Sequence, residues 1–211
     1  MTVETTTGGA STIDKERIAE LTKQQMALFE ERTPRSREYF ERGSKVMPNG
    51  VPSSFQSNDP WPVYIEKGEG TAVVDVDGNS YVDFHNGFGV MCVGHANPDI
   101  GAAVKARVDM GTHFAAPTEG SINVAEELVR RFGLPQWRFT NSGTESTMDA
   151  VHLARGVTGR DGLLKIEGSY HGHHDSVMVS VYPELSDLGD RDDPVSVPYG
   201  AGYPRAITDL T

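Results

Sequence analysis

The chain has 211 residues, of which 37% are hydrophobic, and 30 acidic against 19 basic side chains give it a formal net charge of -11. This length supplies one ordinary core with a smaller appendage, and the negative charge argues against nucleic acid or an anionic membrane as a partner. The single cysteine, Cys92, excludes an intramolecular disulfide. Because we find neither a signal peptide pattern nor an apolar run of membrane-spanning length, we expect a soluble cytoplasmic protein.

The first part of the chain predicts a tail, two helices and a loop. Residues 1–12 are rich in Thr and Gly and are expected to be disordered. Apolar residues recur on one helical face over residues 13–32, and a second helix is predicted over 35–45. The following stretch, as far as Pro62, is interrupted by prolines and is predicted to be a long loop, which is often functional.

Three short β-like runs come next, at residues 63–66, 71–75 and 80–84. Between the second and third runs, Asp77-Gly78 supplies the residue types that tolerate positive φ in a tight hairpin. These runs predict a small antiparallel meander. We assign residues 13–90 to one N-terminal segment made of the helices, the loop and this meander.

From residue 91 onward, helical and strand-like patterns alternate, which is typical of an α/β fold with a mostly parallel sheet. Helices are predicted after the capping residue Asn97, from Thr118 to Gly133 and from Thr144 to Val157, and the first two carry apolar stripes that we expect to be buried. Strands are predicted at 137–140, 163–167 and 176–181. Since a doubly wound sheet normally has five or more strands, residues 91–211 read as the incomplete first half of a large domain.

A polar turn, Asn141-Ser142-Gly143-Thr144-Glu145, joins a predicted strand to a helix. Backbone N–H groups at the helix start, two hydroxyls and a glycine that allows close approach would suit a phosphate. An ordinary helix cap explains the same residues, and on this stretch alone the cap is favoured. The turn lacks the lysine of a nucleotide P-loop and the glycine spacing of a dinucleotide site.

Residues 167–175 read EGSYHGHHD and raise three alternatives: a metal site, a histidine catalyst or the wall of a cofactor pocket. A metal-dependent hydrolase would use His171, His173, His174 and Asp175. Adjacent ligands on one extended loop cannot all point at one ion, and the sequence has no HExxH motif. We therefore predict no metal and expect His173, His174 and Asp175 to make hydrogen bonds within the loop.

Together, NSGTEST and ARGVTGRDGLLKIEGSYHGHHDSV resemble the class III pyridoxal-phosphate aminotransferases, particularly their glutamate-1-semialdehyde 2,1-aminomutase branch. The resemblance runs from about Val46 to Ser180. It implies the PLP-dependent transferase fold of type I, an α/β fold that is truncated here, and pyridoxal 5'-phosphate as cofactor. It also implies that Ser142, Gly143 and Thr144 hold the cofactor phosphate, with Tyr170 and His171 against the pyridine ring.

For the substrate side we name Ser54, Phe88 and Glu145 as candidates. An ungapped comparison with the aminomutase branch places Gln56 where that branch has an arginine, and Phe88 where it usually has tryptophan. Losing a guanidinium removes a bidentate grip on a carboxylate. This favours an aminotransferase that moves an amino group between an amino acid or amine and an oxo acid or aldehyde. The alternative is the aminomutase, an isomerase of tetrapyrrole biosynthesis.

None of the lysines in the chain lies in the Gly-rich context of the family's Schiff-base lysine: Lys15, Lys23, Lys45, Lys67, Lys105 and Lys165. We therefore expect no catalytic residue in this chain, which resembles the first half of such an enzyme. A second alternative is a non-catalytic fragment or one subunit of a split enzyme. The resemblance implies that the complete enzyme is a homodimer and that its partners are a small-molecule amino donor and an oxo acceptor.

Overall fold

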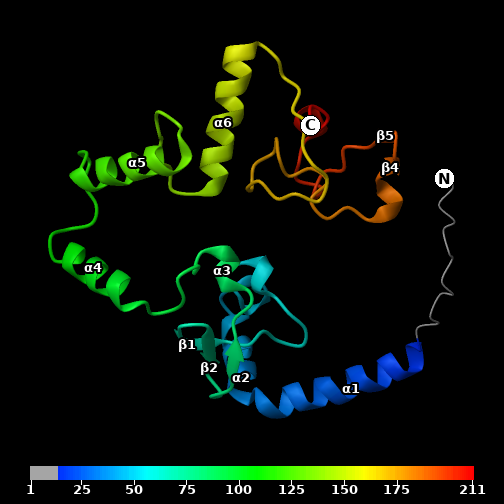
Figure 1. The fold of residues 1–211 in the computed structure, drawn as a ribbon. Helices are drawn as coiled ribbons and strands as arrows, with labels where there is room; N and C mark the ends of the chain where they lie inside the picture. Colours follow the sequence, from blue (N-terminus) through cyan, green and yellow to red (C-terminus); the bar gives the residue numbers. More distant parts are fainter. Residues whose placement is uncertain (1–13) are drawn as a thin grey trace, which may run out of the picture. The chain divides into compact units, whose positions relative to one another are not determined.

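The computed structural model describes residues 14–211, and the chain divides into two compact units between Phe114 and Ala115 (Figure 1). The tail predicted at residues 1–12 lies outside the described residues. This division falls later in the chain than the boundary placed between residues 90 and 91, because helix α4 belongs to the first unit. The assignment of residues 13–90 and 91–211 to two domains stays a prediction.

The first unit contains four α-helices, two short 3₁₀-helices and three strands among its described residues. In chain order they are α1 (Lys15–Arg32), α2 (Pro34–Gly43), η1 (Pro48–Gly50), η2 (Ser54–Gln56), β1 (Ile65–Glu69), β2 (Ala72–Asp75), β3 (Ser80–Val82), α3 (Asn86–Gly89) and α4 (Pro98–Val108). The strands form one antiparallel sheet in the order β1-β2-β3. Both long N-terminal helices and the meander are therefore confirmed, with bounds shifted by a few residues.

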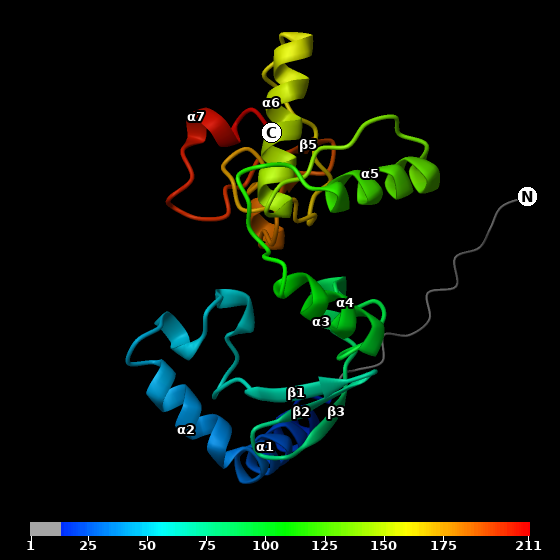
Figure 2. The same ribbon diagram turned by 90° about the vertical axis from the view of Figure 1, so that its left-hand side faces the viewer.

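The second unit contains three α-helices, one 3₁₀-helix and a two-stranded hairpin. They are α5 (Glu119–Phe132), α6 (Gly143–Thr158), η3 (Leu185–Asp187), β4 (Gly189–Asp190), β5 (Asp193–Pro194) and α7 (Arg205–Thr208). Helix α6 runs beside the loops of residues 159–211 in both ribbon views (Figure 2). None of the helices described in residues 14–211 has the length and apolar character needed to cross a membrane.

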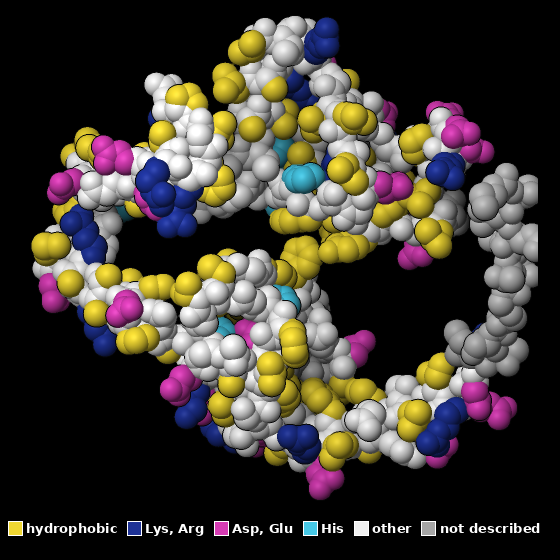
Figure 3. All heavy atoms as spheres, in the orientation of Figure 1, with side chains coloured by type: hydrophobic (Ala, Val, Ile, Leu, Met, Phe, Trp, Pro, Cys, Tyr) yellow, Lys and Arg dark blue, Asp and Glu magenta, His cyan; other side chains and the backbone are white. Residues whose placement is uncertain are grey.

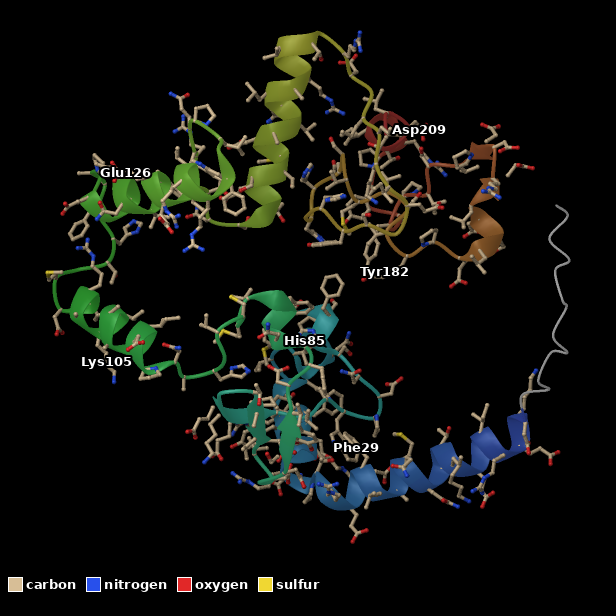
Figure 4. All side chains as sticks on the ribbon, viewed as in Figure 1. Phe29, His85, Lys105, Glu126, Tyr182 and Asp209 are labelled. Carbon is tan, nitrogen blue, oxygen red and sulfur yellow. The ribbon has the colours of Figure 1, made fainter. Side chains whose placement is uncertain are left out.

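Trp61 organises the core of the first unit, where its side chain is buried. Its indole Nε1 donates to the Thr33 hydroxyl at 3.0 Å, and that hydroxyl donates to the Phe29 carbonyl at 2.7 Å. The ring of Phe29, which is labelled in Figure 4, lies 5.8 Å from that of Trp61. The junction between α1 and α2 is thus tied to the loop predicted from its prolines, and the indole N–H has the partner that a buried tryptophan needs.

Asp75 ends β2 and is fully buried. Its carboxylate accepts hydrogen bonds from the backbone N–H groups of Asp77 (3.0 Å) and Asn79 (2.8 Å), from the Asn79 amide (2.9 Å) and from the Tyr81 hydroxyl (2.7 Å). Burial alone raises the pKa of Asp75, but these hydrogen bonds outweigh it and hold the pKa below its usual value. Burial, with the bond to Asp75, raises the pKa of Tyr81 to about 12. The Asp75 carboxylate therefore closes the β2–β3 turn.

Residues 176–181 form the core of the second unit. Val177, Met178, Val179 and Val181 are all buried. Backbone bonds join this segment to its surroundings at separate points: Gly168 N to Ser180 O (2.8 Å), Ser180 N to Val197 O (2.7 Å) and Tyr199 N to Met178 O (3.0 Å). The apolar run predicts a buried segment correctly, but it packs as irregular chain with one isolated bridge, between Val179 and Pro198.

The strands predicted at 137–140, 163–167 and 176–181 are wrong for the described residues, where these segments join no ladder. A strand with apolar side chains on both faces needs strands beside it and helices over it. Leu164 and Ile166 are instead 98% and 79% exposed. Their apolar pattern predicts burial, but residues 115–211 do not bury these side chains.

The apolar stripes of α4 and α5 are also more exposed than predicted. Ile100, Val104 and Val108 on α4 are each more than half exposed, as are Ile122 and Phe132 on α5. Figure 3 shows apolar side chains spread over the visible face of the molecule. Periodicity identifies an amphipathic helix, but burial of its stripe depends on a packing partner. The expected burial of these two stripes is therefore wrong for the described residues.

Candidate functional site

The polar turn at residues 141–145 starts helix α6 as a capped N-terminus. Ser142 is the N-cap, and its hydroxyl oxygen accepts from the Glu145 N–H at 3.2 Å. Glu145 reaches back, so that its carboxylate accepts from the Asn141 N–H at 2.7 Å. The pair resembles a capping box, with the Glu145 side chain bonded one residue before the N-cap, and it explains the local sequence by itself. The assignment of Glu145 to substrate binding stays a prediction.

This cap leaves donors at the helix start. The first helical bond runs from Ser146 N to Ser142 O at 3.1 Å, so the N–H groups of Gly143 and Thr144 precede the helical ladder. A Cβ added at Gly143 would meet open space. The positive end of the helix dipole adds to these N–H groups. The geometry suits an anion that approaches the backbone at Gly143, as the sequence predicts for a phosphate.

The loop at residues 170–174 packs on the first turn of α6. The His173 N–H donates to the Thr144 hydroxyl oxygen at 2.9 Å, and the Thr147 hydroxyl donates to the His171 carbonyl at 2.6 Å. Gly172 makes this approach possible: a Cβ there would lie 2.7 Å from the Thr144 Cα. Because Thr144 accepts from the loop, its own hydroxyl hydrogen stays available to donate. The two predicted cofactor segments therefore meet in this unit.

His173 and His174 make hydrogen bonds from the loop to other segments, whereas the prediction placed their bonds within the loop. His174 Nε2 lies 3.2 Å from the Thr147 hydroxyl, and His173 Nε2 lies 3.4 Å from the Tyr203 hydroxyl. The Tyr203 ring stands edge-on to His173 and to Tyr199. Burial, with Asp175 close by, raises the pKa of Tyr203. Within residues 14–211, no three His, Cys, Asp or Glu side chains gather closely enough to hold a metal ion.

One substrate candidate, Phe88, contacts the residue that follows another candidate, Ser54. Ser54 begins η2, and its neighbour Phe55 places its ring 6.4 Å from that of Phe88. Phe88 also meets the His85 ring at 4.2 Å; His85 is labelled in Figure 4. Phe88 has φ 61°, a left-handed conformation that is uncommon outside glycine. The loop holds an exposed aromatic side chain in a backbone conformation of the kind that often marks functional sites.

Asp83 and His95 attach the short helix α3, which carries Phe88, to the sheet. The Asp83 carboxylate meets His95 Nε2 at 2.6 Å and also accepts from the N–H groups of His85 and Asn86. The hydrogen bond to His95, first among several, holds the pKa of Asp83 below its usual value. Two backbone bonds between Gly70 and His95, at 2.9 and 2.8 Å, complete the attachment. These contacts give His95 a structural role.

Sequence reasoning missed two residues that shape the site. Thr147 lies one helical turn beyond Gly143, and its spacing from Thr144 would have placed both hydroxyls on one side of α6. Gly172 stands between His171 and His173, and both its φ of 108° and the approach of Thr144 explain why it must be glycine. The first omission had a signal in the sequence, whereas the second depends on a tertiary contact.

The start of α6 offers N–H groups and hydroxyls, and the loop that carries Tyr170 and His171 packs against it, within an α/β chain. Residues 54–186 match the family model for class III aminotransferases. The glutamate-1-semialdehyde 2,1-aminomutase of Methanopyrus kandleri is 39% identical over 184 residues, which are 87% of this chain and 41% of that relative. The chain belongs to the class III aminotransferase family, whose members depend on pyridoxal phosphate.

Solved structures agree with this assignment. An omega-transaminase from Sphaerobacter thermophilus superposes with a TM-score of 0.78 at 40% identity and covers 83% of this chain and 40% of that one. A transaminase with PLP bound gives a TM-score of 0.76 at 36% identity and covers 85% of this chain and 41% of that one. The likeness confirms the predicted α/β transferase fold. The chain spans about 40% of the length of these relatives.

Proposed function

We propose that this chain is the part of a class III aminotransferase that holds the cofactor phosphate and one face of its ring. The main observation in support of this proposal is that the loop at 170–174 is bonded to the first turn of α6 through Thr144 and Thr147. An anion site and an aromatic wall are two things that pyridoxal phosphate requires of a protein. Membership of the family, and a similar transaminase with PLP bound, support the same ligand.

The residues fit such a ligand chemically. Ser142 and Thr144 each use their hydroxyl oxygen to accept from backbone, which leaves the hydroxyl hydrogens to donate to a phosphate oxygen. Gly143 lets the phosphate approach the helix start. Tyr170 and His171 are assigned to the pyridine ring, where an aromatic side chain would orient it. When bound, the cofactor supplies an electron sink for the amino-bearing carbon of a substrate.

The proposed reaction is transfer of an amino group between an amino acid or amine and an oxo acid or aldehyde. Gln56 supports this choice, because an amide cannot grip a carboxylate as a guanidinium does. The glutamate-1-semialdehyde 2,1-aminomutase reaction fits equally well, since the curated relative from Methanopyrus kandleri carries that name. The requirement for an acceptor separates them: a transferase needs a separate oxo acceptor and yields two products, whereas the aminomutase converts one substrate into its isomer without an added acceptor. For the complete enzyme we propose a homodimer.

We predict that the chain binds pyridoxal phosphate mainly through its phosphate. Pyridoxal, which lacks the phosphate, is expected to bind at least about tenfold more weakly, and Thr144→Val should weaken pyridoxal phosphate binding by about ten- to a hundredfold, because a charge-assisted hydrogen bond is lost. The measurement is titration of the 211-residue chain, followed by quenching of tryptophan fluorescence. Thr158→Val is the matched control: its hydroxyl bonds the Ala154 carbonyl at the far end of α6. Equal affinities for pyridoxal and pyridoxal phosphate would contradict the proposal.

We predict further that the bound cofactor forms no stable link to a lysine of this chain. Lys165 is the lysine whose pKa burial lowers, which makes it the most reactive amine on physical grounds. Its Nζ lies 3.4 Å from the Ile166 carbonyl, away from the turn at 142–144 in sequence and in its contacts. Borohydride reduction followed by peptide mass mapping checks this. A stoichiometric adduct on one lysine would show that the chain does carry the Schiff-base residue.

A further inference from the structure

Thr147 has more hydrogen-bond neighbours than its single hydroxyl proton can serve. Its oxygen lies 3.0 Å from the Gly143 carbonyl and 3.1 Å from the Thr144 carbonyl, both in its own helix. It lies 2.6 Å from the His171 carbonyl, in the loop. A threonine inside a helix ordinarily returns its proton to a carbonyl three or four residues earlier. The shortest distance assigns the proton to the loop instead.

The same oxygen can also accept a hydrogen bond from His174. Nε2 of His174 lies 3.2 Å from it, and a hydroxyl that donates to His171 has lone pairs left to accept. Burial lowers the pKa of His174, and His152 and Arg155 act in the same direction against Asp175. The ring is therefore neutral near neutral pH, and this contact assigns its proton to Nε2. One side chain on α6 thus binds the loop on both sides of Gly172.

The position of Thr147 links the two segments assigned to the cofactor. Its helical turn also carries Gly143 and Thr144, which begin the anion site. The carbonyl that it binds belongs to His171, next to Tyr170. A Cβ at Gly172 would lie 3.1 Å from its hydroxyl oxygen, so the loop backbone rests directly on it. The hydroxyl of Thr147 is engaged by the loop and the helix, not by the open space at Gly143.

We propose that Thr147 is the positioning residue of this site: without touching the cofactor, it holds the loop bearing Tyr170 and His171 at a set distance from the phosphate turn at 142–144. The inference rests on the proposed function for its ligand. The latch itself, meaning the bonds of the Thr147 hydroxyl to His171 and His174, rests only on the contacts above. Because the loop is already ordered before binding, less of the ligand's binding free energy is lost in ordering the loop.

Three variants of the full chain test the latch: Thr147→Val, which keeps the shape and removes the hydroxyl, Thr147→Ser, which restores it, and Thr158→Val as the matched loss of a hydroxyl on the same helix. In Thr147→Val, amide hydrogen exchange at Gly172 and His173 should quicken about five- to tenfold, and the ¹⁵N shifts of the His174 ring should move toward a mixture of tautomers. The serine and Thr158 variants should resemble the parent chain. Unchanged exchange in Thr147→Val would overturn the latch.

Two ligands then separate positioning from a direct role in the anion site. Thr147→Val should raise the dissociation constant of pyridoxal phosphate about five- to tenfold, while that of inorganic phosphate, measured by ³¹P NMR, stays within about twofold. An equal loss for both ligands would overturn the positioning role, because Thr147 would then belong to the phosphate turn itself. If the parent chain binds no pyridoxal phosphate, the proposed function and the cofactor part of this inference both fail, and the exchange result still decides the latch.

Discussion

Gly172→Ala is expected to lift the loop at 170–174 from α6 and to weaken pyridoxal phosphate binding by about ten- to a hundredfold. Gly172 has φ 108°, which costs an alanine about 1–3 kcal/mol. The new Cβ would also lie 2.7 Å from the Thr144 Cα, a backbone atom that cannot swing aside. Fluorescence titration measures the affinity, and hydrogen exchange at His173 reports whether its bond to Thr144 survives.

Two other glycines separate strain from collision. Gly168 has φ 76° and open space at its Cβ position, so Gly168→Ala imposes strain without a clash. Gly156 lies inside α6 with open space around it, and Gly156→Ala should stabilise the helix by about 0.5–1 kcal/mol and leave binding unchanged. We expect pyridoxal phosphate to bind most tightly to Gly156→Ala, more weakly to Gly168→Ala and most weakly to Gly172→Ala. Equal affinities for the last two would refute the close approach of the loop to α6.

Asp75→Ala should lower the free energy of unfolding of the first unit by about 3–5 kcal/mol. It removes the acceptor of two backbone N–H groups, the Asn79 amide and the Tyr81 hydroxyl, and a buried donor left without a partner costs about 1–3 kcal/mol. Urea unfolding, followed by Trp61 fluorescence in a Trp137→Phe background, reports on this unit. Asp109→Ala, at an exposed position after α4, should stay within about 0.5 kcal/mol.

The acid dependence of this effect has a definite sign. Since the pKa of Asp75 is lowered in the folded chain, its stabilisation is complete above the pKa of an unperturbed aspartate, about 3.9, and is lost as the pH falls through the folded-state pKa. Asp75→Asn keeps the shape without the charge. The difference in free energy of unfolding between parent and variant should therefore narrow at acid pH. A constant gap from pH 7 to pH 3 would show that the charge of Asp75 contributes nothing to folding.

Local signals in the sequence predict the helices and the meander well. Asn97 caps α4 as expected, with its side chain accepting from the N–H groups of Asp99 and Ile100 at 3.1 and 3.2 Å. Gly78, expected to take a positive φ, has φ 87°. Caps, prolines and turn glycines act over a few residues, so their effect does not depend on the rest of the fold. This independence explains why these elements are confirmed.

Segments whose structure depends on distant partners were predicted less well. The residues at 163–167 have the composition of a buried parallel strand, but a strand exists only when another strand completes its hydrogen bonds. Residues 176–181 have the expected burial without the expected ladder. Apolar composition therefore predicts burial of a segment, whereas the presence of a pairing partner decides whether the segment becomes a strand.

For the site, the sequence by itself determined the chemical groups: a capped helix start with Ser142, Gly143 and Thr144, and a loop with Tyr170 and His171. The tertiary structure decided that Thr144 and Thr147 bind that loop, and that Gly172 must be glycine where the two backbones meet. The physical reason is range. Capping and turn preferences act between neighbours along the chain, whereas the fit of one backbone against another depends on the conformation of every residue between them.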